Sequence, residues 1–282
     1  MKFGVITDCF KLPIMKSVDL ASELGFDGIQ IYATGGEFCE LTDSPEKIQN
    51  MLKFFEDKNL EISALCGDMG GYGFQIEKDN YDRVKRTKAI IDLATELGTH
   101  VVTTHIGVIP QDKSNPRYGV MLRALSECGR YARSKDVTVA IETGPEFAET
   151  LLAFIEDTEG GIGANLDPAN LVMVTGQDPV EAVKILGKHI VHTHAKDGIM
   201  FKKTDPEIIY DHFAKGGIEA LNIADYFLET PIGEGNVDFP KYIRALREIG
   251  YDGYLTLERE TGRHPIGDIK NALGTLKKLT TN

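Results

Sequence analysis

The chain has 282 residues, with 31 Lys or Arg against 43 Asp or Glu, which gives a formal net charge of −12. This acidic balance argues against a nucleic-acid partner, because binding polyphosphates requires a positively charged surface. No apolar run approaches the ~20 residues of a membrane span. The N-terminus meets a charge at Lys2 and has no apolar signal segment. We therefore expect a cytoplasmic protein without a membrane or nucleic-acid partner.

The cysteines give no sign of a disulfide framework or a zinc finger. None of the four forms a CxxC pair, and none has zinc-finger spacing. In a chain of this length they are expected to be free thiols in a reducing compartment. They are Cys9, Cys39, Cys66 and Cys128.

Short β-rich runs alternate with helical patterns along the whole chain. Ile48, Met51, Leu52 and Phe55 fall at i, i+3, i+4 and i+7, and Ser44-Pro45 supplies an N-cap and a first-turn proline before them. Similar stripes begin at Ile90 and Phe239. The eight expected strands are Phe3–Thr7, Gly28–Ala33, Glu61–Cys66, His100–His105, Val137–Glu142, Ile162–Asp167, Ile190–His194 and Tyr254–Glu258.

The joints between helix and strand also repeat. The segment Glu23-Leu-Gly25-Phe-Asp-Gly-Ile-Gln-Ile31 closely resembles Glu248-Ile-Gly250-Tyr-Asp-Gly-Tyr-Leu-Thr256, and Glu96-Leu-Gly98 is a partial third copy. Each copy places Gly after a helix, where a left-handed C-cap is needed. The repeat predicts an α/β fold, a (β/α)8 TIM barrel forming a single domain over residues 1–282. A doubly wound open sheet is the alternative, but it seldom needs eight strands with so regular a helix between each pair.

Two stretches interrupt the regular spacing. Residues 67–75 form a glycine-rich loop after the third strand, and residues 196–237 form a long loop after the seventh. Both follow the C-terminal end of a strand, so both are expected over the ligand-binding face, where long loops usually cover or bind substrate. A decorative insertion is the alternative interpretation.

Four strands in the second half of the chain end in residues that bind hard metal ions: Glu142, Asp167, His194 and Glu258. In a closed parallel barrel these ends form one ring, which is where active sites lie. Three carboxylates crowded together repel one another unless a cation lies among them. The set predicts a site for one divalent metal ion, Mn²⁺, Mg²⁺, Co²⁺, Fe²⁺ or Zn²⁺. The alternative is four unrelated polar strand ends.

Other polar residues near these ends are candidates to line the pocket. His105 ends the fourth strand, Asn170 follows Asp167 by three residues, and Lys196 follows His194 by two. His192 lies on the same side of its strand as His194 and deeper, which favours a supporting role. Lys196 could instead be a surface lysine paired with Asp197. The charged residues Glu146, Glu260, Arg263 and His264 also lie in loops on this face, where solvated loop charge is an equally good interpretation.

Five segments in order carry a resemblance that spans essentially the whole chain. They are Ala-Ile-Glu142, Asn-Leu-Asp167-Pro-Ala-Asn170, His-Thr-His194-Ala-Lys-Asp197, Gly233-Glu-Gly-Asn-Val-Asp238 and Leu-Thr-Leu-Glu258. With them the chain resembles the xylose-isomerase-like TIM barrels, which include ketose 3-epimerases, hydroxypyruvate isomerases and inosose-processing enzymes, and more remotely endonuclease IV. The motifs indicate the superfamily and not a substrate.

The resemblance implies that Glu142, Asp167, His194 and Glu258 bind one divalent metal ion. It also implies that Glu142 and Glu258 exchange the substrate proton through a metal-bound enediolate. His105, Asn170, Lys196 and Arg263 are the residues expected to contact the sugar. The implied activity is that of an isomerase or epimerase of a small sugar or keto-sugar.

Two departures weaken the specific prediction of a ketose 3-epimerase. Asn170 stands where those epimerases commonly carry a histidine, and Lys196, Lys202 or Lys203 stands where an arginine is expected. Endonuclease IV needs three zinc ions and more histidines than this chain offers, so DNA repair is disfavoured.

Two other functions stay open at this point. One is a metal-dependent dehydratase of a keto-cyclitol or keto-sugar, which removes the same proton but expels a β-hydroxyl group. The other is a non-catalytic sugar-binding barrel. The oligomeric state is open too, with a homodimer as the prior because dimers are the commonest assembly.

Overall fold

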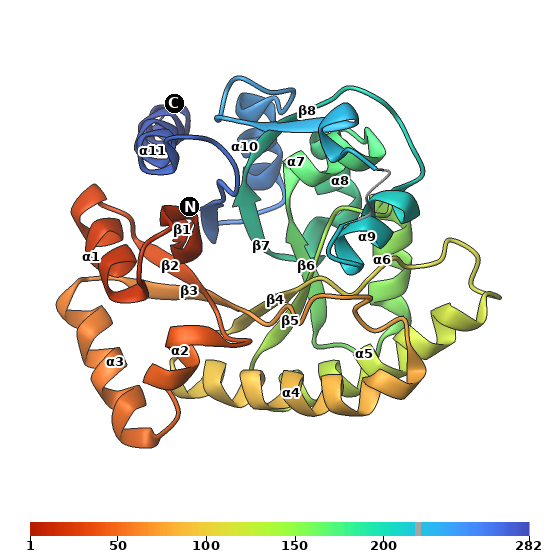
Figure 1. The fold of residues 1–282 in the computed structure, drawn as a ribbon, viewed down its shortest axis with the longest axis horizontal. Coiled ribbons are helices and arrows are strands. Elements are labelled where there is room, and N and C mark those ends of the chain that lie inside the picture. The colour runs from red at the N-terminus through yellow and green to blue at the C-terminus, as the bar shows by residue number, and fades with distance from the viewer. Residues whose placement is uncertain (218–220, 282) are drawn as a thin grey trace.

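The computed structural model describes residues 1–217 and 221–281 and contains a closed barrel of eight parallel strands (Figure 1). Every neighbouring pair around the barrel is parallel, including the closing pair β1 and β2. The predicted (β/α)8 fold is confirmed. In order around the barrel the strands are β1 (Lys2–Ile6), β10 (Tyr254–Leu257), β7 (Ile190–Ala195), β6 (Ile162–Leu166), β5 (Thr138–Glu142), β4 (Val101–Thr104), β3 (Glu61–Cys66) and β2 (Gly28–Tyr32).

Helices surround the strands, with α4 and α5 lying along one side and α10 and α11 along another (Figure 1). No helix among residues 1–217 and 221–281 is both long and apolar enough to cross a membrane. The helices are α1 (Ile14–Leu24), α2 (Gly36–Leu41), α3 (Pro45–Asp57), α4 (Glu77–Glu96), α5 (Pro116–Ser134), α6 (Ala148–Asp157), α7 (Pro168–Asn170), α8 (Pro179–Leu186), α9 (Pro206–Ala214), α10 (Phe239–Glu248) and α11 (Pro265–Thr281).

The predicted helix signals act as expected. Ser44 caps α3 by accepting a hydrogen bond from the backbone N–H of Lys47. Gly25, Gly98 and Gly250, which end the repeated joints, all have positive φ, between 73° and 81°. A left-handed residue is what turns the chain from each helix back into the next strand.

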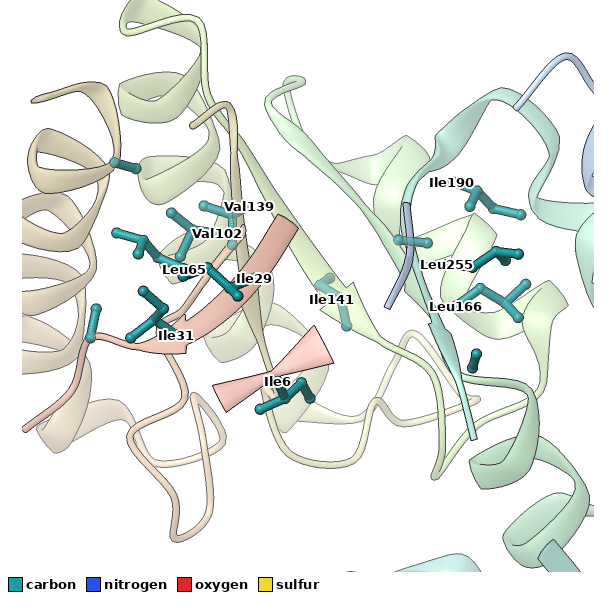
Figure 2. Close-up of a cluster of buried hydrophobic side chains, with 14 of the residues drawn as sticks. Ile6, Ile29, Ile31, Leu65, Val102, Val139, Ile141, Leu166, Ile190 and Leu255 are labelled. Atoms are coloured by element: carbon teal, nitrogen blue, oxygen red, sulfur yellow. The ribbon is translucent and has the colours of Figure 1, made fainter. Parts of the chain in front are cut away.

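Apolar and polar residues alternate along the strands, and this alternation separates an apolar outer shell from a polar barrel interior. Ile29 and Ile31 on β2, and Val139 and Ile141 on β5, are buried in the core (Figure 2). Gln30 lies between Ile29 and Ile31 and points into the barrel, where its Nε2 donates a hydrogen bond to Thr103 Oγ1 on β4 at 3.2 Å. Because successive strand residues point to opposite faces, the outward set packs against the helices and the inward set lines the barrel.

The segment expected as one long loop after β7 contains regular structure. Strands β8 (Asp197–Met200) and β9 (Phe227–Thr230) pair antiparallel, and α9 lies between them in sequence. The long loop expected after β7 therefore carries secondary structure of its own. Each strand is only four residues long, too short for a pattern to reveal, but Asp205-Pro206 is the same kind of N-cap and proline signal as Ser44-Pro45.

Asp197 holds this insertion to the barrel. Its two carboxylate oxygens accept hydrogen bonds from the backbone N–H groups of Gly198, Gly233, Gly235 and Val237, at 2.9 to 3.1 Å. A Cβ on Gly235 would clash with the same carboxylate. The side chain is buried, so it organises the turn at residues 231–238 and does not pair with Lys196 at the surface.

We expect Asp197→Ala to lower the free energy of unfolding by about 3 kcal/mol, because several buried N–H groups lose their acceptor. Urea denaturation measures this. The matched control is Asp178→Ala, which removes an exposed N-cap from α8 and should cost only ~1 kcal/mol. Equal losses for the two variants would contradict the role given to Asp197.

Candidate metal centre

The C-terminal ends of four consecutive barrel strands bring one imidazole and three carboxylates together. Glu142, Asp167, His194 and Glu258 each offer a ligand atom, and these four atoms lie within 4.8 Å of one another. His194 Nδ1 is 2.9 Å from Glu258 Oε2. The same nitrogen is 3.5 Å from Asp167 Oδ2 and 3.6 Å from Glu142 Oε1. All four side chains are buried.

Three of these buried atoms have no hydrogen-bond partner among the described residues: Asp167 Oδ2, His194 Nδ1 and Glu258 Oε2. A buried polar atom left unsatisfied costs ~1–3 kcal/mol, and more when it carries charge. The other oxygen of Asp167 caps α7 by accepting from the N–H of Asn170 at 2.9 Å, which leaves Oδ2 directed at the centre. A divalent cation would satisfy all three atoms at once, so these residues fit a metal ion of the hard or borderline class.

Hydrogen bonds orient His194 for this role. Its Nε2 lies 3.1 Å from Gln30 Oε1 and 3.2 Å from Asn165 Nδ2. With the proton on Nε2, donated to the Gln30 oxygen, the lone pair of Nδ1 faces the carboxylates. Ligating histidines usually donate their other N–H to such an acceptor, which fixes the tautomer and the ring orientation.

A second polar layer lies under the centre. Asn165 Nδ2 donates to Glu142 Oε2 at 3.2 Å, and Asn165 Oδ1 is 2.9 Å from His192 Nδ1. His192 Nε2 lies 3.0 Å from the Thr256 hydroxyl. Burial and the nearby His194 lower the pKa of His192 well below its usual value. A neutral His192 that donates from Nδ1 to Asn165 Oδ1 and accepts at Nε2 from the Thr256 hydroxyl satisfies both hydrogen bonds of its ring.

The charge at the centre favours a cation. Burial opposes protonation of His194, but Glu142 and Glu258 outweigh it and hold the pKa of this imidazole well above its ordinary range. The carboxylates thus attract either a proton onto His194 or a metal ion among them, and metal binding displaces that proton.

A cavity of about 1180 Å³ opens above the centre, and three of the four predicted substrate contacts line it. His105 lies 3.3 Å from Asp68 and 3.6 Å from Glu142. Burial opposes its charged form, yet Glu142 and Asp68 raise the pKa of His105 to about 10. Asn170 Nδ2 donates to Glu142 Oε1 at 3.0 Å.

Lys196 is buried, and the interpretation of a surface lysine paired with Asp197 is wrong. Its Nζ lies 2.7 Å from Glu260 Oε2 and 3.4 Å from Glu258 Oε2. Burial lowers the pKa of Lys196, but the surrounding carboxylates, Glu258 first, raise it well above its usual value. A fixed ammonium group therefore stands at the edge of the candidate metal centre.

The fourth predicted contact, Arg263, is not brought to the cavity. It is exposed and lies outside the lining residues. The cause is the turn after β10, where Glu229 accepts from Arg259 Nη1 at 2.7 Å and from the backbone N–H of Glu260 at 3.1 Å. That anchor places Glu260 and Thr261 beside the cavity, and Arg263 lies beyond them in an exposed position.

Several site residues were not predicted. Gln30 and Asn165 each interrupt an apolar strand with an amide, which is a usable signal, because an inward amide in a barrel needs partners. Asp68 and Tyr210 gave no comparable signal. Both lie outside the barrel strands, and only the tertiary structure places them among the cavity-lining residues.

The chain belongs to the family described as xylose isomerase-like TIM barrel, whose profile matches residues 18–279. The uncharacterized protein MJ1311 of Methanocaldococcus jannaschii is 27% identical over 286 residues, covering 94% of this chain and 86% of that protein. A xylose isomerase domain protein from Planctomyces limnophilus superposes with a TM-score of 0.79 and 26% identity, covering 99% and 96% of the two chains. A D-tagatose 3-epimerase-like protein superposes at 0.74 with 24% identity, covering 100% and 99%.

Glu146, in the loop after β5, is a buried carboxyl group separate from the four candidate ligands. Neither of its oxygens has a hydrogen-bond partner among the described side chains and backbone. Burial raises its pKa to about 8, well above the ~4.3 of an exposed glutamate. The folded state therefore holds this proton over a pH range in which the unfolded chain releases it.

We expect Glu146→Gln to gain stability relative to the wild type as the pH rises from 5 to 8. A carboxyl whose pKa is raised by folding contributes stability at low pH and loses it as the pH climbs, by roughly 1 kcal/mol per unit. Denaturant unfolding at several pH values measures the difference. The control Glu156→Gln, at an exposed position of α6, should show no such trend, and a flat Glu146→Gln difference would contradict the assignment.

Proposed function

We propose that this protein is a divalent-metal-dependent isomerase or epimerase of a small sugar or keto-sugar. The observation that carries the proposal is the convergence of Glu142, Asp167, His194 and Glu258 at the floor of a large cavity, with three buried ligand atoms that lack other partners. Membership of the xylose isomerase-like family supports it.

Glu142, Asp167, His194 and Glu258 would hold the metal ion. When bound, such an ion polarises the carbonyl of a hydroxyketone and stabilises the negative charge that develops on its oxygen. The supporting amides, Gln30 and Asn165, keep His194 and Glu142 oriented for this.

The two glutamates are the proposed proton carriers. Glu142 ends β5 and Glu258 follows β10, and β6 and β7 lie between these strands in the barrel. They therefore reach the cavity from separated positions. One carboxylate takes the proton from the carbon beside the carbonyl, and the other carboxylic acid returns a proton to the opposite face or to the neighbouring carbon. Exclusion of water in the buried floor keeps such a carboxylate reactive.

His105 and Lys196 are proposed to bind the substrate oxygens. Both are held in charged form by neighbouring carboxylates, Glu142 for His105 and Glu258 for Lys196. Each therefore presents an N–H donor next to one of the proton-carrying glutamates. Asn170 adds an amide beside Glu142.

A dehydratase of a keto-sugar or keto-cyclitol is the second candidate. It would begin with the same proton removal and then expel a β-hydroxyl group, which His105 or Lys196 could protonate. An inosose dehydratase of Clostridium botulinum is 23% identical over 258 residues, covering 84% of this chain and 78% of that protein. A structural neighbour described as the IOLI protein with a bound zinc atom is 18% identical with a TM-score of 0.75, and it supports a divalent metal in a protein of this fold.

The metal site is tested by binding. We expect Mn²⁺ to bind the wild-type protein at one site by titration calorimetry, and Asp167→Ala to abolish that binding because a charged ligand is lost. Gln30→Leu should weaken it ~10–100-fold, since outer hydrogen-bond partners of metal ligands typically have that effect. Asp211→Asn, which alters another carboxylate lining the same cavity, is the control. Unchanged Mn²⁺ affinity in Asp167→Ala would overturn the site.

The reaction is tested by deuterium exchange. Incubated with Mn²⁺ and a panel of ketoses in D₂O, the wild type should incorporate deuterium beside the carbonyl and form a new sugar, as followed by NMR. Glu142→Gln and Glu258→Gln should each lower turnover by several orders of magnitude, because the amide cannot carry the proton. A dehydrated product would establish the second candidate instead. Wild-type turnover in either variant would show that the proposed proton carriers are wrong.

A further inference from the structure

The cavity has a polar floor and an apolar outer wall. The floor is the cluster of ligands with His105 and Lys196. The outer wall is built from the insertion after β7, where Ile208 and Phe213 on α9 and Leu228 on β9 line the same cavity. These three side chains remain 45%, 54% and 47% exposed. Exposed apolar groups gathered on one surface mark a binding site.

The wall is held in place. Ala169, Met173 and Val174 form a small apolar cluster apart from the main core, with Tyr210 and Phe227 packed against it. A Cβ on Gly144 would clash with the Tyr210 hydroxyl, so α9 lies directly on the loop after β5. The Tyr72 hydroxyl also bonds Asp211 of α9 at 2.7 Å. The exposed apolar groups therefore belong to a fixed surface facing the floor.

The size of the cavity exceeds what a simple sugar needs. Pockets of ~300–1,000 Å³ accommodate drug-sized ligands, which are larger than a single hexose. The cavity here measures about 1180 Å³. A monosaccharide held at the ligand cluster would leave the outer wall in contact with water.

The charge of the lining disfavours an anionic substrate. Its cationic groups are already paired, Lys196 with Glu260 at 2.7 Å, Arg117 with Glu207, and His105 with Asp68 at 3.3 Å. Outside the ligand cluster, the lining carboxylates are Asp68, Asp205, Glu207, Asp211, Glu229 and Glu260. A phosphate or carboxylate on the substrate would meet repulsion from these groups without a free cation among the described lining residues.

We infer that the substrate is an uncharged glycoside of a keto-sugar whose apolar aglycone lies against Ile208, Phe213 and Leu228. The inference rests on the proposed function, since the sugar ring is placed at the ligand cluster. The polar ring matches the floor, and the aglycone covers apolar surface that otherwise stays hydrated. Burying that surface supplies binding free energy remote from the reacting carbon.

Affinity measurements with two probes test the inference. Calorimetry on the Mn²⁺-loaded protein would compare phenyl and methyl 3-keto-β-D-glucopyranoside. We expect the phenyl glycoside to bind roughly 10- to 100-fold more tightly, which is the gain from burying one aromatic ring. Fructose 6-phosphate should bind no more tightly than fructose. Equal affinities for the phenyl and methyl probes, or a preference for the phosphate, would overturn the inference.

Two variants locate the effect. Phe213→Ser should remove most of the phenyl preference, whereas Phe201→Ser, at a phenylalanine that is 57% exposed on the same insertion but outside the cavity lining, should retain it. A phenyl preference that survives Phe213→Ser, Ile208→Ser and Leu228→Ser would overturn the inference. So would self-association that depends on Phe213 in sedimentation experiments without a phenyl preference, since the wall would then join two copies of the chain.

The outcomes separate this inference from the proposed function. A phenyl preference without turnover of any ketone would support the apolar site and count against the isomerase. Turnover of free ketoses with equal phenyl and methyl affinities would support the isomerase and count against the apolar site.

Discussion

The mutual repulsion of three buried carboxylates around one imidazole is the constraint on which the structure of this site depends. Glu142, Asp167 and Glu258 converge on His194 with their ligand atoms within 4.8 Å. Such a cluster is stable only if positive charge lies within it, from a proton, from Lys196 or from a metal ion. The unsatisfied atoms of Asp167, His194 and Glu258 favour the metal ion, because one lysine at the edge cannot reach all of them.

The barrel makes this arrangement possible by dividing its residues between two faces. Outward residues such as Ile29 and Ile141 form the apolar shell, which supplies the stability that a polar interior does not. Inward residues such as Gln30, Asn165 and His192 then carry a connected hydrogen-bond network beneath the ligands. A buried network of this kind is favourable only when its members are satisfied, and the contacts of His192 at both ring nitrogens meet that condition.

The insertion after β7 supplies the apolar wall of the cavity. Asp197 fixes the base of the insertion through four backbone N–H groups, and Tyr210 and Asp211 fix α9 over the loops of the barrel. The result is a site in which chemistry and selection are supplied by different elements. Strand ends hold the reacting groups, while the insertion presents the apolar wall.

The sequence by itself determined the barrel, the helix caps and the four strand ends, because each depends on local chemistry: strand alternation, a proline and serine at a helix start, a left-handed glycine at its end. It also indicated the lysine after His194, although not its burial. The exclusion of Arg263, the support from Gln30 and Asn165, the partners of Lys196 and the apolar wall were decided only by the tertiary structure. These features join residues far apart in the chain, such as Glu229 with Arg259 and Gln30 with His194, and no local pattern encodes which distant side chains closure of the barrel will bring into contact.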